Sequence, residues 1–546
     1  MITISHIKPN FYLTFPYNAD EVELVRNLPV RTWNKANKCW TIPELAAHTL
    51  DILPNVQWEP EAKMAKTSVK NALLKLVDFK LADLTELDGS EYLRPYQRVG
   101  VNFMTFAKKA LLADDMGVGK TLQAITALIE LGTERNLIIV PSTLKLNWDA
   151  EFKKHFDITP TIIGGTKKKR KELWQSEAKF IIANYDLFTV DRDWGDLPHT
   201  WDAIICDEIV YLKNHSAQRT KAIKKLKADV RIGLSGIPME THLLEYHSIM
   251  EWVRPEVMTT YGRFKERYIE YDFDNTVLGY QNMEEFHQLT APFVLRRTKD
   301  EVMPELPPKV YTPFPLEFDS KALKAYTAMA DEDLEWLTNQ TGEIFSTSPL
   351  DKAIRARQFV ENPASLGFED IKNIKLDWLK EIYAVTDKLV VFCCYLDTVD
   401  LLQKTFNTPY VMSSRTKTDD RVPMVDRYNA EDKAIFILTD AGKFGLNITG
   451  AANMVNFGHF YNPATMRQRE DRLHRKGQEE QVHILNPYIV GTIDVGIREV
   501  AAMRQIENDA LMDGVDKMSR ARLSKIDFRK MMFGQSLRRK LEGKKY

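Results

Sequence analysis

Two separate series of short apolar runs, each alternating with stretches of helical spacing, constrain the fold more than any other feature of the sequence. The first series reads "ALLAD", "NLIIVP", "TIIGG", "KFIIANY", "DAIICDE" and "RIGLSG", within residues 110–236. The second reads "KLVVFCCY", "PYVMSS", "AIFILTD", "ANMVNFG" and "VHILNPYIV", within residues 388–490. Strand–helix alternation is typical of a parallel sheet covered by helices on both faces. The sequence therefore predicts an α/β fold with two parallel-sheet lobes in tandem.

The segments around these two series divide the chain further. The stretch "ELPPKVYTPFPLEF" (305–318) is extended and rich in proline, which indicates a connector followed by an edge-like strand. A length of 546 residues suggests three or four domains of roughly 150 residues. We expect a small mixed α/β N-terminal domain over 1–88, a first lobe over 89–310 with a helical insertion at about 240–300, a second lobe over 311–500 with a helical insertion at about 320–385, and a helical basic tail over 501–546.

Composition narrows the class of protein. No stretch approaches the ~20 apolar residues of a membrane-spanning helix, so no membrane contact is expected. The N-terminus lacks the layout of a secretion signal, and the four cysteines are typical of buried thiols in a reducing compartment. We therefore expect a soluble, intracellular protein, and the compact length favours the cytoplasm of a bacterium or a virus-infected cell over a nucleus. The net charge of −1 leaves nucleic acid open as a partner, because a local basic groove suffices.

The segment "LLADDMGVGKTLQAI" (111–125) has the pattern of a phosphate-binding loop. Gly117 and Gly119 let backbone N–H groups curl toward phosphates at the positive end of the following helix. Lys120 would supply a charge to the β and γ phosphates, and the hydroxyl of Thr121 can ligate Mg²⁺. Asp114 stands where the strict pattern has its first glycine, so a chance glycine-rich turn remains the alternative.

A second buried strand ends on two acids, Asp207 and Glu208. Ligands of parallel α/β sheets bind at the carboxyl ends of the strands, where these acids are expected. One carboxylate there can hold Mg²⁺, and the other can position or deprotonate an attacking water. The alternative is a solvated acidic pair at a strand end. Beside a phosphate loop, the pair favours hydrolysis of a nucleoside triphosphate.

Over residues 89–500 these motifs resemble the superfamily II helicase-like ATPases, and within them the Swi/Snf-type DNA-dependent translocases. The fold that the resemblance implies is a pair of RecA-like lobes. The motifs that carry it are "LRPYQRVGVNFM" (93–104), "LADDMGVGKT" (112–121), "IIVPSTLKLNWDAEF" (138–152), "FVLRRTKDEVMPELPPK" (293–309), "LTDAGKFGLNITGAANMVNF" (438–457) and "YNPATMRQREDRLHRKGQEEQVHI" (461–484).

The resemblance also implies roles for individual residues. Gln97 is expected to recognise adenine, and Arg472 and Arg475 to reach the γ-phosphate as arginine fingers. The implied catalytic set is Lys120, Asp207, Glu208, Gln468, Arg472 and Arg475, with Thr121 and Asp207 as metal ligands. The implied ATP-binding set is Gln97, Asp115, Met116, Gly117, Val118, Gly119, Lys120, Thr121 and Gly445. The implied DNA-binding set is Ser142, Lys145, Asn147 and Lys443.

The expected function is an ATP-driven motor that acts on duplex, forked or branched DNA. It would use ATP and Mg²⁺, act as a monomer, and remodel or anneal DNA in replication, recombination or repair. Two alternatives remain: a strand-separating DNA or RNA helicase, and a nucleotide-gated DNA-binding protein without motor output. The sequence does not identify a protein partner.

The sequence departs from the family at two places. Ile209 and Val210 follow the two acids where relatives have alanine and histidine, and Ile237 replaces a threonine in "SGIP". We expect an apolar contact of Val210 with Ile237 in place of a polar one, with hydrolysis retained and its coupling to DNA altered. The N-terminal stretch 11–43 weakly resembles the HARP module of annealing helicases, which implies binding to DNA junctions. Its aromatic residues are alternatively core residues of a small domain, and we expect this of most of Tyr12, Phe15, Tyr17, Trp33 and Trp40.

Overall fold

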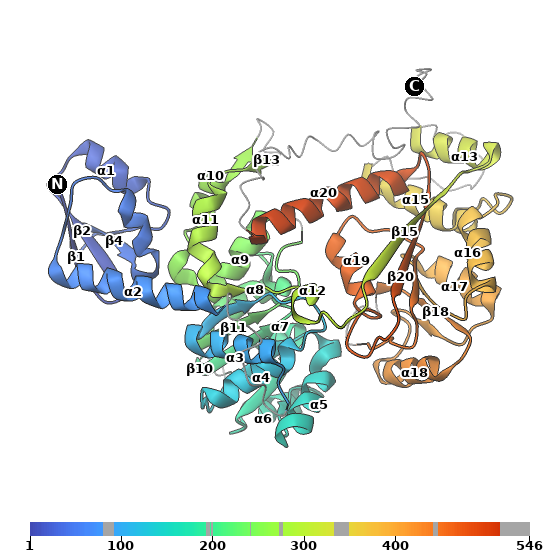
Figure 1. The fold of residues 1–546 in the computed structure, drawn as a ribbon, viewed down its shortest axis with the longest axis horizontal. Coiled ribbons are helices and arrows are strands. Elements are labelled where there is room, and N and C mark those ends of the chain that lie inside the picture. The colour runs from blue at the N-terminus through green and yellow to red at the C-terminus, as the bar shows by residue number, and fades with distance from the viewer. Residues whose placement is uncertain are drawn as a thin grey trace. The chain divides into compact units, whose positions relative to one another are not determined.

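The computed structural model describes residues 1–79, 92–192, 197, 200–240, 242–271, 277–331, 349–440 and 446–513. Among the described residues, the chain divides into two compact units, one built from residues up to Thr298 together with those from Asn508 onward, and the other running from Lys299 to Glu507 (Figure 1). The expected divisions at 88/89, 310/311 and 500/501 stay predictions. Among the described residues, every helix is too short or too polar to cross a membrane.

The N-terminal part of the first unit is built on a five-stranded mixed sheet in the order β3-β4-β2-β1-β5. Strand β1 pairs antiparallel with β2 and parallel with β5. The strands are β1 (Ile2–Ile7), β2 (Asn10–Thr14), β3 (Thr32–Asn34), β4 (Cys39–Pro43) and β5 (Val56–Trp58), and the α-helices are α1 (Ala19–Arg26) and α2 (Pro60–Asp78). Asn18 opens α1, because its side chain accepts hydrogen bonds from the N–H groups of Asp20 and Glu21.

The aromatic residues of this part divide between core and surface. Phe15 and Trp40 pack against its apolar core, and Tyr12 is half-buried. Tyr17 and Trp33 are exposed, so these two of the five aromatic residues do not form part of the core. Trp33 lies on the edge strand β3, where its ring meets the edge of the Trp40 ring.

The seven-stranded sheet of the first unit is parallel throughout, in the order β14-β6-β11-β10-β7-β9-β8. Its strands are β6 (Lys109–Leu112), β7 (Asn136–Val140), β8 (Thr161–Ile162), β9 (Phe180–Asn184), β10 (Thr200–Asp207), β11 (Lys227–Leu234) and β14 (Val294–Leu295). Its helices are α3 (Pro95–Ala107), α4 (Lys120–Glu130), α5 (Lys145–Phe156), α6 (Lys167–Trp174), α7 (Tyr185–Asp191) and α8 (Gln218–Lys224). All six predicted runs form strands, and β7 and β9 are buried along their whole length, as a doubly covered sheet requires.

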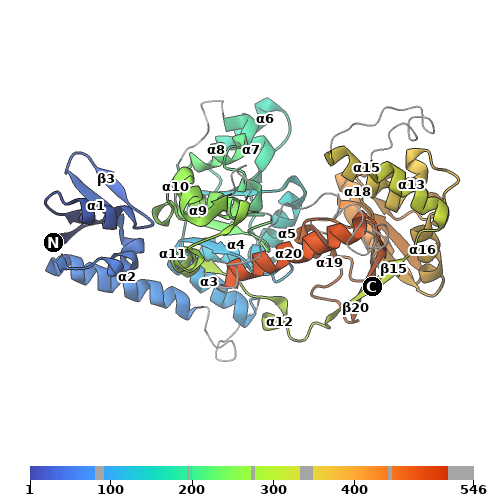
Figure 2. The same ribbon diagram turned by 90° about the horizontal axis from the view of Figure 1, so that it is seen from above.

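The helical insertion expected at about 240–300 contains more than helices (Figure 2). Its helices are α9 (Leu243–Val253), α10 (Tyr261–Tyr268) and α11 (Met283–Thr290), and between the last two lies an antiparallel pair of strands, β12 (Ile269–Tyr271) and β13 (Val277–Tyr280). After α11 the chain returns to the main sheet as β14, at its edge beside β6.

The second unit contains a six-stranded parallel sheet in the order β15-β20-β19-β16-β18-β17. Its strands are β15 (Lys309–Leu316), β16 (Lys388–Phe392), β17 (Val411–Met412), β18 (Ala434–Leu438), β19 (Asn453–Asn456) and β20 (Val482–Ile489). Its helices are α12 (Lys299–Val302), α13 (Ser320–Asp331), α15 (Pro349–Glu361), α16 (Ile374–Ala384), α17 (Leu396–Phe406), α18 (Thr418–Ala430), α19 (Pro463–Glu470) and α20 (Ile493–Asp513). Strand β15 is the predicted edge strand, and its position at the edge accommodates Pro313 and Pro315. The helical tail expected over 501–546 begins inside α20, and its residues after Asp513 lie outside the described residues.

Candidate nucleotide-binding site

The phosphate loop joins the end of β6 to the start of α4. Gly117 and Gly119 both have left-handed backbone angles, with φ of 83° and 82°. A side chain at Gly119 would also lie 2.3 Å from Nε2 of Gln97. The left-handed conformation therefore favours glycine at Gly119, and a larger residue would also displace the end of the Gln97 side chain. The loop ends at the N-terminus of an 11-residue helix, which is a favourable place for an anion.

Lys120, the first residue of α4, is bound to its own loop. Its Nζ donates hydrogen bonds to the main-chain oxygens of Asp114, at 2.7 Å, and Asp115, at 2.9 Å. Thr121 follows and is half-buried. The ammonium group is therefore held at the loop, where a phosphate bound by the loop's N–H groups would meet it.

Gln97 lies against the same loop from α3. Its Oε1 accepts a hydrogen bond from the N–H of Arg94, and its Nε2 donates to the main-chain oxygen of Val118 at 3.1 Å. The hydroxyl of Tyr96 donates to the same oxygen at 3.1 Å. Gln97 is thus placed beside the loop, and its role in reading adenine stays a prediction.

Asp114, at the position of the missing first glycine, has a definite structural partner. Nε of Arg297 donates to Oδ1 of Asp114 at 3.0 Å, and its NH2 group donates to Oδ2. The same guanidinium donates to Oε1 of Gln123 at 3.1 Å and to the main-chain oxygen of Tyr96. Asp114 is fully buried and Arg297 nearly so. The departure from the strict pattern is therefore half of a forked ion pair beneath the phosphate loop.

Asp207 ends β10, and both of its carboxylate oxygens accept hydrogen bonds. Nε1 of Trp148 donates to Oδ2 at 2.7 Å, and the N–H of Glu208 donates to Oδ1 at 2.9 Å. Burial raises the pKa of Asp207, while the bond from Trp148 and the positive charge of Lys120 oppose that rise. The charge of Lys120 therefore acts on the carboxylate of Asp207, and the catalytic roles of both residues stay predictions.

Glu208 follows in a left-handed conformation, with φ of 48°, which is uncommon for a residue other than glycine. The adjacent main-chain oxygen of Asp207 accepts a hydrogen bond from the hydroxyl of Tyr185 at 2.8 Å, and the Tyr185 ring stacks on that of Tyr211. These contacts fix the turn that carries both acids. Sequence reasoning missed Trp148 and Tyr185, although Trp148 lies inside the quoted motif 138–152.

The two family departures meet different surroundings. Ile209 is fully buried, and a Cβ placed on Gly233 would lie 2.5 Å from its Cδ1. The larger side chain is thus accommodated because its neighbour on β11 is glycine. Val210 is buried, and the N–H of Ile237 donates to Oγ of Ser235 at 3.2 Å. The contact of Val210 with Ile237 stays a prediction.

The residues expected to bind DNA lie at the start of α5. Ser142 and Asn147 are exposed, and Lys145 is half-buried. Nζ of Lys145 donates to the main-chain oxygen of Ile163 at 3.3 Å, and burial lowers the pKa of this lysine. Lys443 and Gly445 lie outside the described residues.

In the second unit, the expected arginine fingers converge on one carbonyl group. NH1 of Arg472 donates to the main-chain oxygen of Leu446 at 3.4 Å, and NH1 of Arg475 donates to the same oxygen at 3.1 Å. Nε of Arg472 also donates to the main-chain oxygen of Gln468 at 3.1 Å. These hydrogen bonds bring Gln468, Arg472 and Arg475 together near Leu446. We call residues 468–475 the arginine segment.

The oxygen ligands of the first unit suit a magnesium ion that arrives with a nucleotide. Among the described residues, no group of three or more His, Cys, Asp or Glu side chains could hold a metal by itself. Mg²⁺ in such sites takes one or two protein oxygens and completes its shell with phosphates and water. Asp207 and Thr121 fit that demand, because one offers a carboxylate and the other a hydroxyl at the phosphate loop.

The fold has two parallel-sheet units. Together with the phosphate loop, the acids Asp207 and Glu208, and the arginine segment, it is typical of the helicase-like class of proteins. Comparison with family profiles finds an SNF2-related domain over residues 96–365 and a helicase conserved C-terminal domain over residues 374–477. The chain therefore belongs to the Swi/Snf-type family of helicase-like ATPases, which confirms the resemblance. The HARP-like subgroup stays a prediction.

Several curated relatives are similar over most of this chain. YwqA of Bacillus subtilis, named provisionally as an ATP-dependent helicase/translocase, is 30% identical over 455 residues, covering 77% of this chain and 49% of its own. The DNA repair and recombination protein RAD54 of Oryza sativa is 26% identical over 571 residues, covering 88% of this chain and 57% of its own. The chain thus spans about half the length of these relatives. A solved structure of the Sulfolobus solfataricus SWI2/SNF2 ATPase core in complex with dsDNA has 26% identity and a TM-score of 0.38, and covers 80% of this chain and 96% of its own.

Proposed function

We propose that this protein hydrolyses ATP and uses the energy to translocate on duplex or branched DNA. The observation that carries the proposal is the shared site of Lys120 and the buried Asp207, where a lysine of a phosphate loop acts on a carboxylate at a strand end. Family membership supports the same chemistry. The proposed use is remodelling or annealing of DNA in replication, recombination or repair.

The proposed catalytic steps assign one task to each residue. The loop N–H groups and Lys120 hold the phosphates, and Glu208 orients and deprotonates the attacking water. A bound magnesium ion, held by Thr121 and Asp207, would neutralise charge on the phosphates. Arg472 and Arg475 stabilise the charge of the transition state, a contribution worth roughly 10³ to 10⁵ in rate for arginine fingers.

DNA binding is proposed at Ser142, Lys145 and Asn147. The exposure of Ser142 and Asn147 beside a lysine is compatible with contacts to a phosphate backbone. Such contacts position the protein on DNA without reading base sequence, which suits a motor that must move along any sequence.

The experiment that tests the proposal is ATP turnover with single-stranded, duplex, forked and four-way DNA. We expect duplex and branched DNA to stimulate turnover, and Lys120→Ala and Glu208→Gln to abolish it. Turnover without any response to DNA would contradict the motor assignment. ATP binding without turnover would leave a nucleotide-gated DNA-binding protein, and separation of strands in the same samples would support a strand-separating helicase.

A further inference from the structure

Lys299, the first residue of α12, is a buried cation with two acceptors on the arginine segment. It is 4% exposed, and its Nζ donates to Oδ1 of Asp471 and to the main-chain oxygen of His474, each at 2.5 Å. These two acceptors lie immediately before the two arginines, Arg472 and Arg475. The position of Lys299 therefore fixes the backbone from which both guanidinium groups extend.

Further contacts join the residues that follow Lys299 to the arginine segment. Nε2 of His474 lies 2.8 Å from the main-chain oxygen of Pro307. Nζ of Lys309 and the hydroxyl of Tyr311 donate to the same oxygen of Glu470, at 2.8 and 2.7 Å. The attachment is thus continuous from α12 to the start of β15.

Opposite charges strengthen the attachment of Lys299 to Asp471. Burial alone would raise the pKa of Asp471, but the positive charges of Lys299 and Lys309 outweigh it, and the pKa lies below its ordinary value. Asp471 is therefore ionised at neutral pH. Removing Lys299 would leave a buried carboxylate without its main counter-charge, and the backbone around it would have to rearrange.

Two residues before Lys299 stands Arg297, which holds the carboxylate of Asp114 beneath the phosphate loop. Two trans peptide units span at most roughly 7 Å between their end Cα atoms. One short piece of chain, residues 296–299 ("RRTK"), therefore carries both the cation that holds the phosphate loop and the cation that holds the arginine segment. We call residues 296–299 the RRTK strap.

We propose that Arg297 and Lys299 are positioning residues for ATP hydrolysis, Arg297 for the phosphate loop and Lys299 for the arginine segment. This inference rests on the proposed ATPase function. Neither residue is assigned contact with the nucleotide. Lys299 acts on the reaction through Arg472 and Arg475, and Arg297 acts through the phosphate loop.

The first test replaces Lys299 with methionine, which keeps the apolar stem and removes the charge. We expect Lys299→Met to lower kcat 10- to 100-fold while KM for ATP and the binding of a fluorescent ATP analogue change less than twofold, because the phosphate loop is intact. In the background of Arg472→Ala with Arg475→Ala the same substitution should have little further effect, since both groups through which Lys299 acts are then absent. Lys299→Arg should restore part of kcat.

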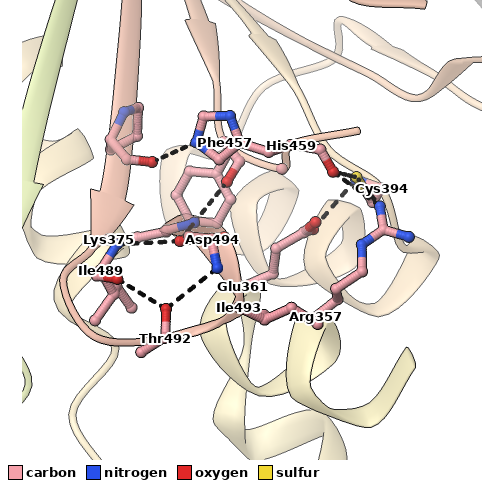
Figure 3. Close-up of polar contacts among 12 residues, drawn as sticks. Arg357, Glu361, Lys375, Cys394, Phe457, His459, Ile489, Thr492, Ile493 and Asp494 are labelled. Carbon is pink, nitrogen blue, oxygen red and sulfur yellow. Dashed lines mark hydrogen bonds and ion pairs between the residues drawn. The ribbon is translucent and has the colours of Figure 1, made fainter. Parts of the chain in front are cut away.

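The matched control is Lys375→Met. Lys375 is a fully buried lysine of the second unit, and it pairs with Asp494 at 2.7 Å, a residue outside the arginine segment (Figure 3). It should lower stability without lowering kcat per folded molecule. Equal losses of kcat in the Lys299 and Lys375 variants, or a full Lys299 effect in the absence of both Arg472 and Arg475, would overturn the inference.

A second measurement separates this inference from the proposed function. Hydrogen exchange of peptides covering the arginine segment, 468–475, should rise in Lys299→Met and stay unchanged in Lys375→Met, whether or not the protein turns over ATP. Unchanged exchange in Lys299→Met would contradict the positioning role even in an active enzyme. Absence of ATP turnover in the unmodified protein would instead contradict the proposed function.

Discussion

The indole Nε1 of Trp148 donates a 2.7 Å hydrogen bond to Oδ2 of Asp207, across 59 residues of sequence. This bond stabilises the ionised carboxylate and so opposes the rise in pKa that burial causes. A hydrogen bond to the charged form of an acid keeps that acid ionised at lower pH. We therefore expect the proposed ATPase activity in mildly acidic solution to depend on Trp148, which is assigned no contact with the nucleotide.

Trp148→Phe tests this dependence. Loss of the bond raises the pKa of Asp207 further, so the carboxylate is protonated at higher pH. The pH at which kcat/KM falls on acidification should therefore rise. The control is Trp174→Phe, which removes a comparable 3.0 Å bond from a buried indole to Oδ2 of Asp191. The control should lose stability, but its kcat/KM should fall at the same pH as that of the unmodified protein. The same pH in both variants would contradict the assignment of Asp207.

Asp114→Gly restores the strict phosphate-loop pattern, yet we expect it to destabilise the protein. It leaves the guanidinium of Arg297 buried without its carboxylate, a loss that costs about 3–5 kcal/mol in other proteins. Chemical denaturation of the first unit measures the change.

The double variant Asp114→Gly with Arg297→Leu removes both charges and should recover a large part of the stability. If the single and double variants are equally unstable, the ion pair is not what holds the loop.

Ile209→Ala restores the alanine usual in the family at this position. Because Ile209 is fully buried, the truncation should cost about 2–5 kcal/mol in the free energy of unfolding. Adding Gly233→Ala should regain part of that loss, since the new methyl group lies where Cδ1 of Ile209 was, whereas Gly233→Ala alone should clash. A double-mutant cycle in urea measures this coupling, and additive effects would exclude it.

His459 makes the stability of the second unit depend on pH. Burial lowers its pKa to about 4, although Asp494 opposes the shift and Lys375 supports it, and Nε2 lies 2.8 Å from the main-chain oxygen of Pro487 (Figure 3). Below the ordinary histidine pKa of ~6.5, only the unfolded state takes up this proton, so stability falls between pH 6.5 and 4.

His459→Gln should therefore lose less stability between pH 7 and pH 5 than the unmodified protein, by about 2 kcal/mol. Urea unfolding followed by circular dichroism at both pH values measures the difference. His6, which lies in the N-terminal sheet and contacts Glu44, is the histidine for a control substitution. Equal pH dependence in the His459 variant and the unmodified protein would show that this ring is not the group that titrates.

The strands were predictable because burial on both faces of a parallel sheet demands unbroken apolar runs, as in "NLIIV" and "AIFIL". The phosphate loop was predictable because its glycines and lysine are contiguous. The strands β12 and β13 were missed, because three or four residues carry too little periodicity to stand out among helices.

The ion pairs between residues far apart in the chain could not be predicted from the sequence pattern. Arg297 meets Asp114 across 183 residues, and Lys299 meets Asp471 across 172. Local periodicity reports which face of an element is buried, but it does not report which distant charge lies opposite. The motif 293–309 carried part of the family resemblance, and only the fold shows what its cations hold.

Strand β15 has one consequence for how the chain is made. Its partner is β20, so Lys309 pairs with Val482, roughly 170 residues later. At ~5–20 residues per second on the ribosome, this strand must wait on the order of ten to thirty seconds before its partner is synthesised. During that interval Pro313 and Pro315 cannot donate backbone hydrogen bonds, which makes the nascent strand a poor template for pairing with a neighbouring polypeptide.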